Sequence, residues 1–143
     1  MERRFNLERT LTGRERALLR RAQDEGWLNA GTNGGNRLVR AYGRWCWRVR
    51  IPMVWFERRS AHSRYCRVHL DMFTTAHAVS EQGLAEIIAF LPDARTSVHD
   101  VRAEWVRGSD AGTVAGRLFR AATRKGNYEL CSRGAPGSRA AGA

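Results

Sequence analysis

The sequence contains almost no lysine: Lys125 is the only one, and 24 of the 25 basic residues are arginine. A nucleotide-binding P-loop needs a lysine inside its glycine-rich loop, so this class of site is excluded. Schiff-base chemistry would have to use Lys125, which lies in a short stretch typical of a turn. Alanine and glycine are abundant, as in a GC-rich genome that encodes arginine where others encode lysine. The net charge is therefore more informative than the preference for arginine over lysine.

Cysteine and long apolar runs are also scarce. The three cysteines are Cys46, Cys66 and Cys131, and their wide spacing predicts reduced thiols in a cytoplasmic protein. The apolar runs fall far short of the roughly 18 to 20 residues that cross a bilayer. The first residues lack the apolar stretch of a signal peptide. We therefore expect a cytoplasmic protein with no membrane segment.

Positive charge is plentiful and unevenly placed. The formal net charge is +11, from 25 basic and 14 acidic residues. Residues 26–70 contain nine arginines and a single acid, Glu57, which makes a net +8 in this window. Residues 71–143 contain nine basic and eight acidic residues. Charge concentrated in one segment favours a polyanionic partner over general solubility.

The first half of the sequence predicts one helix followed by three strands. Thr12 and Glu15 form a capping-box pattern, and apolar residues follow at helical spacing. Residues 45–51 alternate apolar and basic side chains, which is typical of a strand that ends near Pro52. Residues 54–56 and 65–72 are expected to form two further strands, with the three paired antiparallel.

The second half predicts a helix capped by Ser80 and stopped by Pro92, then a strand over 98–106. A further helix begins near Asp110, and a short strand over 128–131 follows. The predicted class is α+β in the order α-β-β-β-α-β-α-β, with a mostly antiparallel sheet and helices packed on one face. Residues 1–131 would be a single domain, and residues 132–143 a disordered Gly/Ala/Arg tail.

The arginine-rich strands carry the functional prediction. Alternation places Trp45 and Trp47 in the core and Arg48, Arg50 and Arg67 together on the opposite sheet face. Arginines gathered on one face repel each other unless an anion meets them, and otherwise form only a solvated surface. We therefore predict a small nucleic-acid-binding protein, with RNA favoured over DNA because basic sheets are common RNA platforms. The predicted interface residues are Arg37, Arg40, Arg48, Arg50, Arg58, Arg59, Arg64 and Arg67.

Two alternatives come from other classes. The basic face could dock on an acidic protein surface. The chain could also be a metal-dependent nuclease using Glu57, His69 and Asp71, with Glu104 as a further candidate. Binding is favoured over catalysis, because these residues also suit surface ion pairs with arginines. The spacing of the cysteines and histidines does not suit zinc, and no cofactor is expected.

Overall fold

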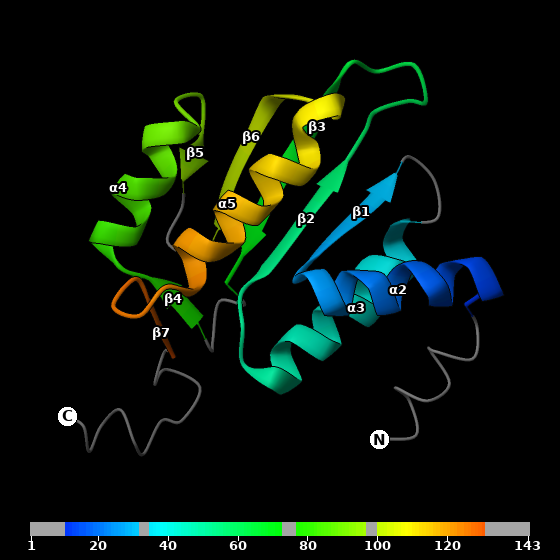
Figure 1. Ribbon diagram of the computed structural model, residues 1–143, viewed down its shortest axis with the longest axis horizontal. Coiled ribbons are helices and arrows are strands. Elements are labelled where there is room, and N and C mark those ends of the chain that lie inside the picture. The colour runs from blue at the N-terminus through cyan, green and yellow to red at the C-terminus, as the bar shows by residue number, and fades with distance from the viewer. Residues whose placement is uncertain (1–10, 32–34, 73–76, 97–99, 131–143) are drawn as a thin grey trace.

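The computed structural model describes residues 11–31, 35–72, 77–96 and 100–130 (Figure 1). The described elements are, in chain order, α2 (Gly13–Glu25), β1 (Trp27–Gly31), α3 (Gly35–Val49), β2 (Met53–Glu57), β3 (Tyr65–Asp71), β4 (His77–Val79), α4 (Glu81–Phe90), β5 (Arg95–Thr96), β6 (Asp100–Arg107), the 3-10 turn η1 (Gly108–Asp110), α5 (Ala111–Thr123) and β7 (Tyr128–Leu130).

Five strands form one sheet in the order β1-β2-β3-β6-β5, and β4 pairs with β7 in a separate two-stranded sheet. Strands β1 and β2 are parallel, while every other described pair is antiparallel. The predicted α+β class with a mostly antiparallel sheet is therefore confirmed. The predicted tail over 132–143, together with Cys131 and His99, lies outside the described residues.

Helix α2 begins and ends as its sequence indicates. The Thr12 backbone N–H donates to the Glu15 carboxylate at 2.8 Å, and the Glu15 N–H donates to the Thr12 hydroxyl at 3.1 Å. Gly26 ends the helix in the left-handed region at φ 81°, and a Cβ there would lie 2.8 Å from the Phe119 ring. Glycine is the one residue that meets both constraints. The chain turns at Gly26, and Trp27 begins β1.

The strand predicted over residues 45–51 is wrong, because this segment is the second half of helix α3. The alternation covers only seven residues, whereas a helical repeat begins earlier, at Leu38. Leu38, Tyr42 and Cys46 follow one another every four residues, and all three are buried. Helix α3 also connects the parallel strands β1 and β2, and parallel strands require such a crossover.

The other predicted elements are confirmed, apart from small differences in their ends. The Ser80 hydroxyl accepts the Gly83 N–H at 3.1 Å and caps α4 as expected. Asp110 also precedes a helix, α5, but its side chain makes no capping hydrogen bond, because the turn η1 leads directly into α5. Strands β1, β4 and β5 are additions that the sequence pattern did not reveal.

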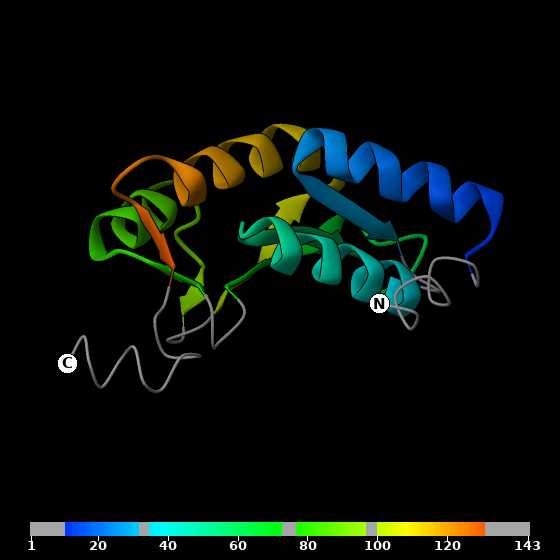
Figure 2. The same ribbon diagram turned by 90° about the horizontal axis from the view of Figure 1, so that it is seen from below.

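Helices lie on both sides of the large sheet (Figure 2). Helices α4 and α5 cover one face, over a core that includes Val54, Val68 and Leu118. Helix α3 packs on the opposite side of β1 and β2, in a second core that includes Leu28 and Met53. Placement on one face, as predicted, therefore holds for α4 and α5 and fails for α3. Within the described residues, no helix is both long and apolar enough to span a membrane.

Candidate nucleic-acid interface

Helix α3 presents a row of arginines to solvent. Arg40, Arg44 and Arg48 are exposed and recur every four residues, so they lie on one side of the helix. Successive members are about 6 Å apart along the helix axis. The helix contains no aspartate or glutamate. Arg44 was not among the predicted interface residues, although the helical repeat that begins at Leu38 identifies it.

Arg50 extends this row just beyond the helix end. Its N–H donates to the Trp47 carbonyl at 3.3 Å, and the Ile51 N–H donates to the Cys46 carbonyl at 3.0 Å, which together form a Schellman motif. Arg50 occupies the left-handed position of this motif at φ 65°, where glycine is usual. Its carbonyl also accepts the Tyr128 hydroxyl. The backbone therefore fixes the point from which this exposed side chain leaves.

We call Arg40, Arg44, Arg48 and Arg50 the α3 row. Within the described part of the chain, none of the four forms an ion pair with an acidic side chain. Their charge is therefore available to an external anion. The prediction that Arg48 and Arg50 share a sheet face with Arg67 is wrong. Arg48 lies on helix α3, Arg50 directly follows the end of this helix, and only Arg67 is on a strand.

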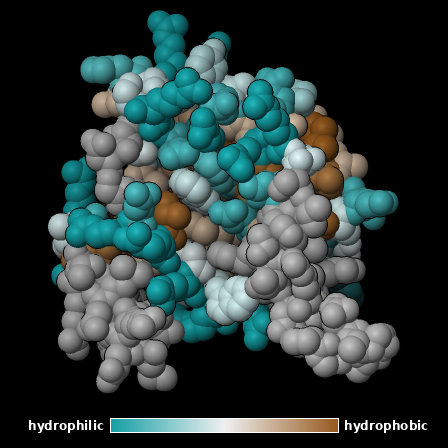
Figure 3. Space-filling model, turned by 180° about the vertical axis from the view of Figure 1, so that it is seen from behind, coloured by the Kyte–Doolittle hydropathy of each residue, from teal (hydrophilic) through white to brown (hydrophobic). Residues whose placement is uncertain are grey.

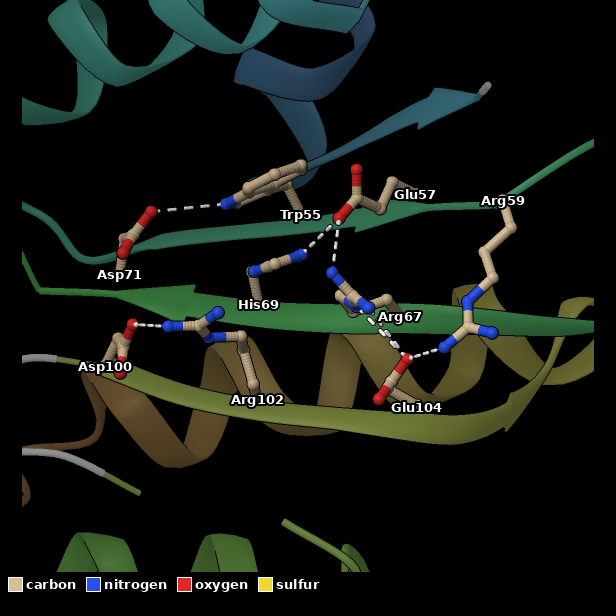
Figure 4. Close-up of polar contacts among 9 residues, drawn as sticks. All are labelled: Trp55, Glu57, Arg59, Arg67, His69, Asp71, Asp100, Arg102 and Glu104. Atoms are coloured by element: carbon tan, nitrogen blue, oxygen red, sulfur yellow. Dashed lines mark hydrogen bonds and ion pairs between the residues drawn. The ribbon is translucent and has the colours of Figure 1, made fainter. Parts of the chain in front are cut away.

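Three other predicted interface arginines are already paired with carboxylates. Arg37 donates to both carboxylate oxygens of Glu15, at 2.9 and 3.0 Å, and ties α3 to α2. Arg59 and Arg67 both bind Glu104, at 2.7 and 2.9 Å (Figure 4). Glu15 and Glu104 therefore offset part of the positive charge that the sequence places in this segment.

The last two predicted arginines lie beside the connection between β2 and β3. Arg64 is exposed, and its carbonyl accepts the Gly108 N–H at 2.8 Å. Arg58 is half-buried with its guanidinium over Gly108, where a Cβ would lie only 2.3 Å from a guanidinium nitrogen. A side chain at position 108 would therefore displace the Arg58 guanidinium. These two arginines are not part of α3.

The candidate catalytic residues come together on the sheet face opposite α5, as Figure 4 shows. His69 stacks on Trp55 with ring centroids 3.9 Å apart, and its Nε2 lies 2.8 Å from a Glu57 carboxylate oxygen. The Trp55 indole N–H donates to Asp71 at 3.3 Å. Arg67 approaches the same Glu57 oxygen at 3.8 Å. The predicted proximity of Glu57, His69 and Asp71 is therefore present, with Trp55 bound to both of the last two.

The surroundings shift the acid–base behaviour of this face. Burial lowers the pKa of His69, and the hydrogen bond to Glu57 opposes that change. Burial raises the pKa of Asp71, and the hydrogen bond from Trp55 opposes it. Hydrogen bonds from Arg67 and Arg59 lower the pKa of Glu104 to about 2. At neutral pH, Glu104 is thus a carboxylate held between two guanidinium groups.

The described residues do not form a metal centre. No group of three His, Cys, Asp or Glu side chains among them is placed to hold an ion. Cys46 and Cys66 are both buried, and they belong to the two different cores on either side of the sheet. The carboxylates near His69 bind arginines or Trp55. The sheet face therefore contains an acid–base pair and guanidinium groups, arranged mainly as ion pairs.

The sheet face continues to the edge formed by β5 and β6. Arg102 binds Asp100 at 3.1 Å. A polar groove beside this pair is lined by Arg67, Asp93, Arg95, Thr96, Asp100, Arg102, Ala103 and Glu104. This lining contains three arginines and three acids, so it has no formal excess of positive charge. Figure 3 shows this side of the molecule, where hydrophilic side chains cover much of the described surface.

No protein-family model matches this chain, and no match is found among curated proteins or solved structures.

Proposed function

We propose that this chain binds nucleic acid through the α3 row, which holds the phosphate backbone. One observation carries the proposal: the four exposed arginines lack acidic partners in the described part of the chain, whereas Arg37, Arg59 and Arg67 have them. Guanidinium groups bind phosphate oxygens in a bidentate fashion, and such charge-assisted hydrogen bonds are the stronger kind. The available charge therefore lies where a regular polyanion can reach it.

The spacing of the row favours a nucleic-acid backbone over an irregular acidic protein surface. Arg40, Arg44 and Arg48 are evenly spaced along one side of a helix, and a phosphodiester strand carries one charge at each regular step. Arg50 adds a fourth charge just beyond the helix end. Because these contacts involve phosphates, affinity is expected to depend on salt more than on base sequence.

The proposal is tested with the double variant Arg44→Gln/Arg48→Gln. At low salt, we expect labelled RNA or DNA to bind this variant at least roughly tenfold more weakly, because each contact contributes on the order of 1 kcal/mol or more. The slope of log K against log salt should become shallower by roughly 1.4 to 1.8 for two lost phosphate contacts. Fluorescence anisotropy over a salt series measures both quantities.

A matched control removes the same charge on the other side of the sheet. Arg120 and Lys125 are exposed, on α5 and in the turn after it. The variant Arg120→Gln/Lys125→Gln should bind more tightly than the α3 variant. Equal losses in the two variants would show that net charge acts without a defined surface. Wild-type protein that binds polyglutamate but neither RNA nor DNA would instead indicate a protein partner.

A further inference from the structure

Trp47 lies on the outward side of α3 and is not among the described residues that pack against either core. It is seven residues after Arg40 and three after Arg44, which places it on the same side of the helix as the α3 row. Trp45, two residues earlier, is about 200° away around the helix and packs against the second core. The exposed fraction of Trp47 is 44%. The sequence-based placement of both tryptophans in the core is therefore wrong for Trp47.

Large exposed apolar side chains are few in the described part of the chain, and Trp47 is the one that lies on the arginine-bearing side of α3. Trp47 and Val49 are among the four, the others being Tyr65 and Ile88. Three arginines lie within three residues of Trp47 in the sequence: Arg44, Arg48 and Arg50. An aromatic surface next to cations that bind phosphate is the combination that single-stranded nucleic acids use, because each nucleotide offers both a charge and a flat base.

We propose that Trp47 is a stacking site for an unpaired nucleobase, so that the α3 row binds single-stranded nucleic acid in preference to duplex. This inference rests on the proposed function, since the row must first hold the backbone. In a duplex, the bases are already stacked on each other and cannot reach Trp47 without unstacking. In a single strand, a base beside a bound phosphate is available for the indole.

The test uses two substitutions at one position in the full chain. Trp47→Leu keeps an apolar side chain with good helix propensity but has no aromatic face, while Trp47→Phe keeps an aromatic face. The probes are labelled single-stranded oligouridylate, a blunt RNA duplex of the same length, and heparin, a polyanion without bases. We expect Trp47→Leu to bind oligouridylate about 5- to 150-fold more weakly, as for the loss of one stacked base.

Trp47→Phe should recover most of this affinity, and neither variant should change heparin binding or the slope of its salt dependence. Thermal melting should be alike for both variants, because each keeps an apolar side chain at this largely exposed position. Unchanged oligouridylate binding by Trp47→Leu, or equal losses for oligouridylate, duplex and heparin, would overturn the stacking site while leaving phosphate binding intact. Wild-type protein that binds none of the three probes would overturn the proposed function, and the stacking site with it.

Discussion

The α3 row and the polar face of the sheet both contain arginines from the same basic segment, but they present charge differently. On the sheet, Glu104 binds Arg59 and Arg67, and Glu57 binds His69. On α3, no acid occurs over the whole helix. Trp55 joins the two regions, because it packs against the core beneath α3 and stacks on His69.

This difference shows that a count of charges is not a count of binding groups. An arginine that binds a carboxylate must give up that ion pair before it can bind phosphate. The free energy lost with the ion pair then offsets most of the free energy gained from the phosphate contact. An unpaired exposed arginine loses only water and counterions, and their release favours binding. Four predictions use substitutions that weaken or sharpen this difference, from the largest expected effect to the smallest.

The α3 row depends on a helix anchored by a few buried side chains, so removal of an anchor should have the largest effect. Leu38 is 3% exposed in the core between α3, β1 and α2. We expect Leu38→Ala to lower the free energy of unfolding by about 2 to 5 kcal/mol, through lost burial and the cavity left behind. Urea denaturation measures this change. Val39→Ala, at a partly buried neighbour, should cost much less; a similar cost would mean that Leu38 is not an anchor.

Removal of Glu104 should make the sheet face resemble the α3 row. In Glu104→Gln, Arg59 and Arg67 lose their shared carboxylate, and Arg67 keeps only its longer 3.8 Å approach to Glu57, so both become more available to phosphate. We expect tighter nucleic-acid binding and a slope of log K against log salt that is steeper by up to roughly 1.4 to 1.8. A salt series with wild type alongside measures it. If binding remains unchanged, the ion pairs are not what keeps this face from binding.

The sheet face should respond to pH, whereas the α3 row should not. The pKa of His69 is lowered in the folded protein, so between the unfolded value near 6.5 and the folded value the unfolded state binds more protons. The contribution of neutral His69 to stability is thus present above pH 6.5 and is lost as pH falls through the folded pKa. Unfolding midpoints at several pH values should show less of this loss in His69→Phe, which keeps a ring on Trp55.

Asp71 acts in the opposite direction, because its raised pKa makes the folded state the better proton binder near and above the unfolded value of 3.8. Its contribution grows as pH falls through the folded pKa. The two groups are distinguished by comparing His69→Phe with Asp71→Asn. Nucleic-acid affinity at fixed salt should stay constant from pH 6 to 8, since arginines remain charged. A wild-type pH dependence that survives in both variants would assign the titration to other groups.

The smallest effect is expected at Arg50, where structure and binding have opposite requirements. Glycine is better suited to φ 65°, so Arg50→Gly should stabilise the fold by about 0.5 to 1 kcal/mol while weakening nucleic-acid binding. Arg50→Ala removes the same charge without relieving the backbone. The two variants should therefore bind alike and differ in unfolding midpoint. Equal midpoints would mean that the left-handed position costs little here.

Much of the fold is predictable because its signals are local. The capping box of α2 and the cap of α4 need only residues three positions apart, and both are present. The alternation over β3 is also a local pattern, since one face of that strand is buried against α5. The strand predicted over 45–51 is wrong because a pattern of only seven residues is compatible with both the two-residue repeat of a strand and the roughly 3.6-residue repeat of a helix. Only the packing of Leu38, Tyr42 and Cys46 on the sheet decides for the helix.

The sequence by itself determined that positive charge is concentrated between residues 26 and 70, and that it consists of arginine. It could not determine which of these charges are available, because Glu15 and Glu104 lie 22 and 37 residues from the arginines they bind, Arg37 and Arg67. Tertiary structure decided this by bringing Glu15 to Arg37 and Glu104 to Arg67, and no carboxylate of the described residues to the α3 row. Coulomb attraction acts over a few ångströms of space, whatever the separation along the chain.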